Sequence, residues 1–534
     1  MHKLSKKQRY FLSVLSGILM TISFPYSGSL TIVGFIAWIP ILLVEASISK
    51  ENYRSRKVFT HSFITFLTYN LGTTWWVIYA SGAGGCMAFI ANSLLMAFVF
   101  YLFHLTKKHV GAKEGYIALL VYWISFEYFH YNWESSWPWL TYGNIFSIHP
   151  SWVQWYSYSG ALGGTLWVLI INLLIFRAYQ NVLLKGEAWK IQTPFFYLAG
   201  LFFIVPMIIS ISMYFSYTEK KDPVNVIVAQ PNIDPYNEKF NVDLFEQLDV
   251  LFNSGKYKKE LKPDLFIAPE TAIAYSFYEN QLQQIGLSNY FSKRQETLGG
   301  CPILIGASTI KIYDKKESPA STKLEDGPGF IEYYNTSLLF NNKTDYSFVH
   351  KSKLVPGVEK IPFTSYFSFL ENLSIDLGGT TGTLGIEKEP QILTTEKFKF
   401  APVICYESIF GEFVSQQCKK GAELICIITN DGWWRDTPGY KQHNSFASLR
   451  AIENRRSVVR SANTGTSSII NQRGEITHKT DWWVPATIQA DVNLNKELTF
   501  YSIYGDFMGR SLSFVGVLLL LFTFVKYFKK LVNR

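Results

Sequence analysis

The chain has 534 residues, of which 48% are hydrophobic and 17% aromatic, and it carries a formal net charge of +9. This length leaves room for several domains, and the charge alone fits either nucleic acid or an anionic membrane as a partner. Most basic residues of the first half lie in short clusters between long apolar runs, a pattern typical of membrane topology, so we expect no nucleic-acid partner.

Eight apolar runs are suited to cross a bilayer, which takes roughly 20 largely apolar residues. They lie at about 10–25, 30–48, 60–80, 85–105, 115–130, 160–177, 196–216 and 511–528. Lysine and arginine cluster after the second, fourth, sixth and eighth runs, whereas the loops after the first, third and fifth runs carry neither. Because basic loops stay in the cytoplasm, this alternation predicts about eight spans, two cytoplasmic termini and an outward segment 217–508.

Two features near the outer ends of these spans allow either a structural or a functional interpretation. The loop around 131–158 is rich in tryptophan, and we favour an interfacial aromatic belt over a lipid-facing floor beneath the outward domain. Glu127 lies near the outer end of the fifth run, where a carboxylate either marks function or sits in water at the helix end.

Beyond residue 217, short β-rich runs alternate with polar or helical stretches, which predicts an α/β layered domain. Strands are expected at 224–230, 264–269, 302–308, 335–340, 399–405, 424–429, 457–462, 467–471 and 486–491, helices near 242–255, 277–295 and 440–455, and an exposed loop at 311–330. The predicted organisation is an N-terminal transmembrane bundle of about seven helices (1–216), an extracytoplasmic domain (217–508), and a C-terminal transmembrane helix with a basic cytoplasmic tail (509–534).

Five cysteines are spread along the chain without the spacing of a metal finger, and an odd number cannot pair off completely. They are Cys86, Cys301, Cys405, Cys418 and Cys426. The sequence therefore predicts at least one free thiol, and neither a bound metal nor another cofactor. Cys426 lies in the middle of a predicted strand and is expected in the core.

Three residues are candidates for catalysis. Glu270 and Cys405 each end a predicted strand, and Lys351 stands in a loop. A thiolate is a competent nucleophile that a nearby ammonium favours, and a carboxylate can take the thiol proton and later return it to a leaving group. Taken singly, each has a simpler explanation: a buried cysteine, a solvated glutamate and a loop lysine. Residue chemistry alone therefore predicts only an outward α/β domain with candidate nucleophiles.

A family resemblance joins these three residues. Pro269-Glu270-Thr271, Lys351-x-x-Leu354-Val355-Pro356-x-x-Glu359 and Cys405-Tyr406-Glu407 resemble the Glu–Lys–Cys signatures of the nitrilase superfamily. With Gln230-Pro231-Asn232, Thr429-Asn430-Asp431-Gly432-Trp433-Trp434 and Arg460-Ser461-Ala462-Asn463-Thr464-Gly465, they are similar to its membrane branch, the apolipoprotein N-acyltransferases. The likeness covers nearly the whole chain, and it implies that the segment 217–508 is a nitrilase-like α-β-β-α sandwich.

The resemblance also implies a role for each residue. Glu270 would act as general base and then general acid, and Cys405 would hold a fatty acyl chain as a thioester. Lys351 and the backbone N–H of Tyr406 would stabilise the oxyanion. The donor would be a membrane phospholipid, and the acceptor the α-amine of the diacylglyceryl-cysteine of an apolipoprotein, at the periplasmic side of a bacterial inner membrane. Further supporting or substrate-binding positions are Glu359, Tyr406, Glu407 and Trp433.

The sequence departs from the family pattern at a few positions. Lys353 replaces a histidine, and Gly357-Val358 replace Phe-Gly, but Glu359 keeps its spacing. A tryptophan expected after the Gln-Pro-Asn motif has no match, because Phe240 is displaced by about one position. The apolar segment 361–376, with Phe367 and Phe369, is interpreted evenly as an ordinary helix or as an arm that dips into lipid beside the site.

Two rival functions use the same residues. A membrane-anchored amidase or nitrilase would admit water to the thioester, but anchoring needs only one span. A polytopic sensor or transporter would use a degenerate enzyme domain for binding, but all three catalytic residue types are present. The sequence therefore favours an acyltransferase that works through a thioester at Cys405.

Overall fold

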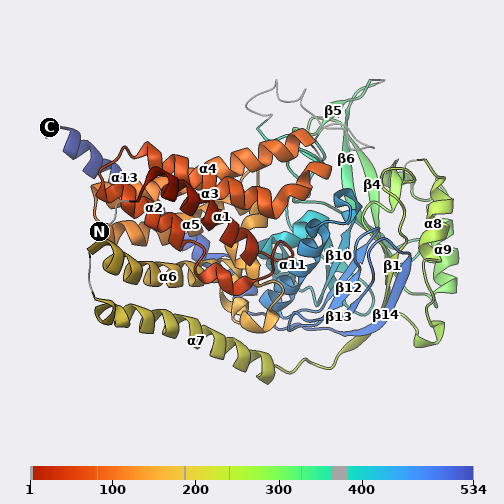
Figure 1. The fold of residues 1–534 in the computed structure, drawn as a ribbon. Helices are drawn as coiled ribbons and strands as arrows, with labels where there is room; N and C mark the ends of the chain where they lie inside the picture. Colours follow the sequence, from red (N-terminus) through yellow and green to blue (C-terminus); the bar gives the residue numbers. More distant parts are fainter. Residues whose placement is uncertain are drawn as a thin grey trace.

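The computed structural model describes residues 4–80, 82–185, 188–239, 241–325, 327–363 and 383–532. The first part of the chain forms a helical bundle, and the C-terminal helix returns to pack against its fifth helix (Figure 1). The bundle consists of α1 (Lys6–Ser23), α2 (Ile39–Lys50), α3 (Arg56–Thr74), α4 (Gly82–His109), α5 (Ala112–Asn132), α6 (Tyr156–Lys185), α7 (Thr193–Ser216) and α13 (Phe507–Val532).

Each of these eight helices overlaps one predicted apolar run. Among the described residues, five segments are long and apolar enough to cross a membrane: Thr31–Lys50, Gly84–His109, Tyr156–Val182, Trp189–Ser216 and Phe507–Val532. A helix such as α3 is less apolar because it buries polar side chains, including His61, Thr65 and Asn70, against its neighbours. The apolar helices fit a membrane bundle, whereas the number of about eight spans stays a prediction.

The second half contains two β-sheets. The strands of the first are β1 (Pro223–Gln230), β2 (Leu265–Ile267), β3 (Ile273–Tyr278), β4 (Ile303–Tyr313), β5 (Thr322–Lys323), β6 (Phe330–Phe340), β7 (Tyr346–His350) and β14 (Ala486–Asn493). Those of the second are β8 (Leu393–Thr394), β9 (Lys399–Ile404), β10 (Leu424–Thr429), β11 (Val458–Ala462), β12 (Ser468–Ile470) and β13 (Ile476–Lys479). The first runs β14-β1-β2-β4-β6-β5, with β3 on β4 and β7 on β6, and the second runs β13-β12-β11-β10-β9-β8.

The sheets and their helices stack in four layers. Apolar side chains of both sheets, such as Val228, Ile404 and Ile428, form the core between them. The outer face of the first sheet packs against α8 (Leu244–Phe252) and α9 (Leu287–Thr297). The outer face of the second packs against α10 (Gly411–Lys419) and α11 (Pro438–Asn454), and this layer lies against the bundle (Figure 1). The order α-β-β-α agrees with the nitrilase-like domain that the family motifs predict.

The predicted strands all overlap observed ones, but two other expectations for this domain are wrong. The helix predicted at 277–295 begins only at Leu287, because residues 273–278 pair with β4 as a parallel strand. The loop predicted at 311–330 is in part a β-arm, since β4 continues to Tyr313 and pairs there with Phe330 of β6. In both stretches the pairing with a neighbouring strand decides the backbone conformation.

The tryptophan-rich loop after α5 lies between the bundle and the α/β domain. Trp139 is 1% exposed and packs against Trp434 and His443 of that domain, so the interfacial-belt interpretation is wrong for this residue. Glu127 is also buried rather than solvated, and its carboxylate accepts hydrogen bonds from Tyr142 N–H (2.8 Å) and the Thr165 hydroxyl (2.7 Å). Glu127 thus helps hold in place the loop on which the α/β domain rests.

Candidate active site

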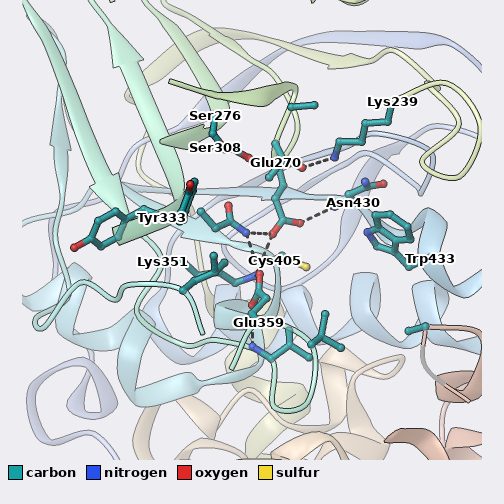
Figure 2. A pocket seen from close by; sticks show the side chains of 18 of the residues that line it. Lys239, Glu270, Ser276, Ser308, Tyr333, Lys351, Glu359, Cys405, Asn430 and Trp433 are labelled. Atoms are coloured by element: carbon teal, nitrogen blue, oxygen red, sulfur yellow. Dashed lines mark hydrogen bonds and ion pairs between the residues drawn. The ribbon is translucent and has the colours of Figure 1, made fainter. Parts of the chain in front are cut away.

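Four loops that follow strands meet at one edge of the sandwich. Glu270 follows β2, Lys351 follows β7, Cys405 follows β9 and Asn430 follows β10. These strands belong to two different sheets, and their carboxyl ends point to the same edge, which is where α/β folds commonly hold functional groups. The three candidate catalytic residues therefore line one cavity, although they are far apart in the sequence (Figure 2).

Glu270 is 7% exposed, and both of its carboxylate oxygens accept hydrogen bonds. Oε1 accepts from Asn335 Nδ2 (2.7 Å) and Lys351 Nζ (3.1 Å), and Oε2 accepts from the backbone N–H of Asn430 (3.1 Å). Gly306 makes this position possible, because a side chain there would collide with the backbone of Glu270. The carboxylate is fixed from three directions in the orientation that a general base needs.

Lys351 is 1% exposed and lies between two carboxylates. Its Nζ donates to Glu270 Oε1 (3.1 Å) and to Glu359 Oε1 (2.7 Å), while Asn335 Nδ2 donates to the same two carboxylates. The second oxygen of Glu359 accepts from Val355 N–H (2.8 Å). Glu359 therefore orients Lys351 and also holds the loop that follows it.

Cys405 begins η10 (Cys405–Ile409) with a φ of +50°, a left-handed conformation that is unfavourable for a residue with a side chain. Its carbonyl oxygen accepts from the Ser408 hydroxyl (2.7 Å) and contacts His443 Nε2 (3.2 Å). His443 Nδ1 lies 2.9 Å from Oδ1 of the buried Asp431. This network holds the sharp turn that presents the thiol after the strand end.

The charges of the site leave the carboxylate ionised and the thiol protonated. Burial alone would raise the pKa of Glu270, but Lys351 and Asn335 outweigh it and hold that pKa below its ordinary value. Burial would lower the pKa of Lys351, but Glu270 and Glu359 keep it well above its ordinary range. Burial and the charge of Glu270 raise the pKa of Cys405. Attack by Cys405 therefore requires its proton to move to a base.

The two residues after Cys405 connect the turn to its surroundings. Glu407 is buried, and it accepts from the backbone N–H groups of Ile404 (2.8 Å) and Ser352 (2.6 Å), so it joins the cysteine turn to the lysine loop. Burial raises the pKa of Glu407 to about 7, although these N–H groups oppose the shift. The Tyr406 hydroxyl donates to the carbonyl of Ser136 in the bundle (2.7 Å). Both side chains support the turn rather than face the cavity.

The cavity has a volume of about 190 Å³ and lies next to the bundle. Trp433 and Trp434 of η11 (Asp431–Trp434) line it together with Ala80, which directly follows a bundle segment. Trp434 also packs against Trp76, with ring centroids 4.8 Å apart. Pockets for drug-sized ligands commonly measure about 300–1,000 Å³, so this cavity encloses only a small reacting group, and any larger substrate extends beyond it.

Sequence patterns gave no role to several polar residues of the cavity, among them Lys239, Asn335 and Asn430. Asn335 lies inside β6, and Asn430 belongs to a motif noted without a chemical role. Lys239 adjoins Phe240, which lies outside the described residues. A lone asparagine or lysine carries no periodic or spacing signal, and its role becomes visible only when Glu270 stands beside it.

The proposed lipid arm with Phe367 and Phe369 also lies outside the described residues, which stop at 363 and resume at 383. All five cysteines are free, and Cys301, Cys418 and Cys426 are buried. Cys426 lies in β10, which confirms its place in the core. Within the described ranges no group of three or more histidine, cysteine, aspartate or glutamate side chains could hold a metal ion.

Comparison with known proteins agrees with this geometry. The carbon–nitrogen hydrolase family matches residues 229–497, which include every loop of the site. The chain belongs to the carbon–nitrogen hydrolase family. The apolipoprotein N-acyltransferase N-terminal domain matches residues 16–174 of the bundle. The two matches confirm the resemblance to the apolipoprotein N-acyltransferase branch of this family.

Two relatives of this carbon–nitrogen hydrolase extend over nearly the whole chain. The apolipoprotein N-acyltransferase of Chlorobaculum tepidum is 28% identical over 96% of either chain. That of Geobacter metallireducens is 27% identical over 94% of this chain and 92% of its own. Among solved structures, a mutant of the amidase from Nesterenkonia sp. AN1 covers 54% of this chain and 99% of its own, at 15% identity and a TM-score of 0.35.

Proposed function

We propose that this protein is an apolipoprotein N-acyltransferase that moves a fatty acyl group from a membrane phospholipid, through a thioester on Cys405, to an apolipoprotein. The observation that carries this proposal is the cavity that Glu270, Lys351 and Cys405 share beside a bundle of apolar helices. The family match of both halves and the full-length relatives support the same activity. The rival amidase and sensor functions find no comparable support.

The first half-reaction loads the enzyme. Glu270 takes the proton of Cys405, and the sulfur attacks an ester carbonyl carbon of the phospholipid. The Lys351 ammonium and the backbone N–H of Tyr406 stabilise the negative oxygen of the tetrahedral intermediate. When the carbon–oxygen bond breaks, Glu270 returns the proton to the glycerol oxygen, and a lysophospholipid leaves. The acyl chain remains on Cys405 as a thioester.

The second half-reaction discharges the thioester to an amine. The α-amine of the diacylglyceryl-cysteine at the N-terminus of an apolipoprotein attacks the thioester carbonyl and transfers a proton to Glu270. The carbon–sulfur bond then breaks, the Cys405 sulfur regains the proton, and an amide leaves. Glu359, Tyr406 and Glu407 act by positioning. Trp433 lines the cavity, which supports a contact with the substrate.

The proposal includes a place in the cell. Residues 1–216 and 509–534 span the inner membrane of a bacterium about eight times, with both termini in the cytoplasm. Residues 217–508 form the catalytic domain on the periplasmic side. The alternation of basic loops supports this orientation, and the apolar faces of α7 and α13, with exposed side chains such as Ile208 and Leu521, support their contact with lipid.

Intact mass spectrometry of the full-length protein, incubated with phosphatidylethanolamine in detergent micelles, tests the proposal. We expect one fatty-acyl adduct that hydroxylamine removes and that disappears on addition of a diacylglyceryl-cysteine peptide. Cys405→Ala should form no adduct, whereas Cys86→Ala, which removes the exposed thiol, should form it normally. An active wild-type enzyme without an adduct, or an adduct that persists in Cys405→Ala, would contradict the proposal.

A further inference from the structure

One end of the active-site cavity is polar, and neither half-reaction uses it. Lys239 lies there, 4% exposed, and its ammonium donates a hydrogen bond to the Thr271 hydroxyl. Among the described residues, no carboxylate forms an ion pair with Lys239. A buried cation without a paired anion is costly, because burial removes its hydration. Burial accordingly lowers the pKa of Lys239 to about 8, although Glu270 and Cys405 oppose the shift.

Two serine residues line the cavity on the same side of Glu270. Ser276 of β3 and Ser308 of β4 are neighbours across the strand pair, since the adjacent residues Phe277 and Thr309 are paired. In the described part of the chain, neither hydroxyl makes a side-chain hydrogen bond. Figure 2 shows Lys239, Ser276 and Ser308 on one side of Glu270, opposite Glu359. This end thus offers one cation and two free hydroxyl donors.

The other end of the cavity is apolar and faces the bundle. Ala80 and Trp434 line the cavity there, and Trp434 packs against Trp76 of the bundle. Val358 and Leu384 line it beside Glu359, whose carbonyl accepts the Leu384 N–H (2.9 Å). In Figure 2 the red and tan ribbons of the transmembrane half lie below Glu359, away from Lys239. Along the cavity, an apolar end beside the bundle is followed by the nucleophile and then by a cationic end with hydroxyl groups.

We propose that Lys239, together with the hydroxyls of Ser276 and Ser308, forms a subsite for the phosphodiester group of the phospholipid that donates the acyl chain. A glycerophospholipid has the same order along its length: an apolar chain, an ester carbonyl, and an anionic phosphate a few bonds beyond. Ammonium and hydroxyl groups both donate hydrogen bonds to phosphate oxygens. Glu270 is close to this subsite, but its charge is paired with the Lys351 ammonium, which lies 3.1 Å from Oε1.

The subsite rests on the proposed function and gives it a donor preference. The Lys239 ammonium has lost its hydration through burial, and a phosphate group would compensate for that loss. This compensation occurs only while the phospholipid is bound. The subsite should therefore favour a phospholipid over a neutral glyceride with the same acyl chains, and the preference should appear in the loading of Cys405 rather than in the transfer to the amine.

Donor selectivity of the full-length enzyme tests the subsite. Adduct formation on Cys405 is timed in phosphate-free micelles with dioleoyl phosphatidylethanolamine or with dioleoylglycerol, which lacks the phosphate. We expect Lys239→Met to slow loading from the phospholipid by about 10- to 100-fold and loading from dioleoylglycerol by less than about 3-fold. Lys239→Arg should restore part of the rate, Ser276→Ala and Ser308→Ala should each cause a smaller selective loss, and Lys293→Met, which removes an exposed lysine, should change neither rate.

Several results would overturn the subsite. An equal loss with both donors would mean that Lys239 acts through Glu270 or Cys405, and no loss with either would exclude a role for it. In the wild type, the loading rate from dioleoylglycerol could reach the rate from the phospholipid only after inorganic phosphate is added. This result would mean that the site binds free phosphate. No adduct from either donor in the wild type would overturn the proposed function, and the subsite with it.

Discussion

Glu270 and Cys405 hold opposite protonation states at rest, and this difference sets the pH dependence of the enzyme. The base must be ionised, and the pKa of Glu270 lies below its ordinary value because Lys351 and Asn335 stabilise the carboxylate against burial. The pKa of Cys405 is raised by burial and by Glu270, so few molecules hold a thiolate at neutral pH. The thiol and the base therefore act as a pair.

This pairing predicts that acyl loading does not rise with pH above neutrality. With an uncharged p-nitrophenyl ester as donor, the rate should change little between about pH 7.5 and pH 8, decline below pH 7 as Glu407 gains a proton, and fall steeply below the ordinary glutamate pKa of about 4.3, where Glu270 gains a proton. Stopped-flow release of nitrophenol measures the rate, and Glu270→Gln should abolish it at every pH. A rate that rises tenfold per pH unit through neutrality would instead indicate attack by a free thiolate.

Some residues of the site could be predicted from the sequence, and others could not. Glu270, Lys351 and Cys405 could be predicted because each stands in a motif of several residues, two of them at a strand end. Asn335 and Lys239 could not, because a single polar residue in a strand or loop has many ordinary uses. Their roles depend on distances, such as the 2.7 Å between Asn335 Nδ2 and Glu270 Oε1, that only the folded chain defines.

The turn that follows β9 is an element whose shape depends on Glu407. This buried carboxylate accepts the N–H groups of Ile404, Ser352 and, at 3.3 Å, Lys353, and thereby joins two loops that carry catalytic residues. Replacement of Glu407 by glutamine keeps the side-chain volume. The amide NH₂ group would then face a backbone N–H group, and two donors cannot form a hydrogen bond with each other. The turn that follows β9 should then become less stable, although Glu270, Lys351 and Cys405 all remain in place.

We therefore expect Glu407→Gln to lower the free energy of unfolding by about 1–3 kcal/mol and to slow acyl loading at least tenfold. Chemical denaturation and adduct timing measure the two effects. Glu389→Gln serves as the control, because Glu389 forms an exposed ion pair with Lys420 and, among the described residues, no other ion pair. Normal loading in a destabilised Glu407→Gln enzyme would separate the turn's stability from catalysis and contradict the positioning role.

Elements as a whole were predictable where their pattern was regular. The buried strands β1, β10 and β11 coincide closely with apolar runs of five to eight residues. Residues 273–278, which form β3, carry no clear strand pattern because they are few and partly exposed, and the polar composition of the neighbouring α9 hides the boundary between the two elements. The inner parts of β4 and β6 were predicted as strands, but their outer parts were not, because the outer residue pairs are stabilised by each other rather than by a core.

At the scale of the molecule, the two halves act as one unit. Gln442 of α11 is fully buried, its Nε2 donates to the carbonyl of Pro25 (3.1 Å), and its Oε1 accepts from Trp139 Nε1 (2.8 Å). One side chain of the α/β domain thus contacts two separate segments of the bundle. The cavity could not have been located from sequence, because its walls come from both halves. Its orientation to the membrane follows from the orientation of the bundle.

That orientation is open to a direct test in intact cells. In a Cys86→Ser background, which removes the exposed native thiol, Lys343→Cys places a thiol at an exposed turn between β6 and β7, and Arg54→Cys places one in an exposed basic loop. If basic loops are cytoplasmic, a maleimide that cannot cross the inner membrane should label Lys343→Cys in intact cells and Arg54→Cys only after lysis. The opposite pattern would put the cavity on the cytoplasmic side, away from exported lipoproteins, and an acyltransferase that serves the periplasm could not work from there.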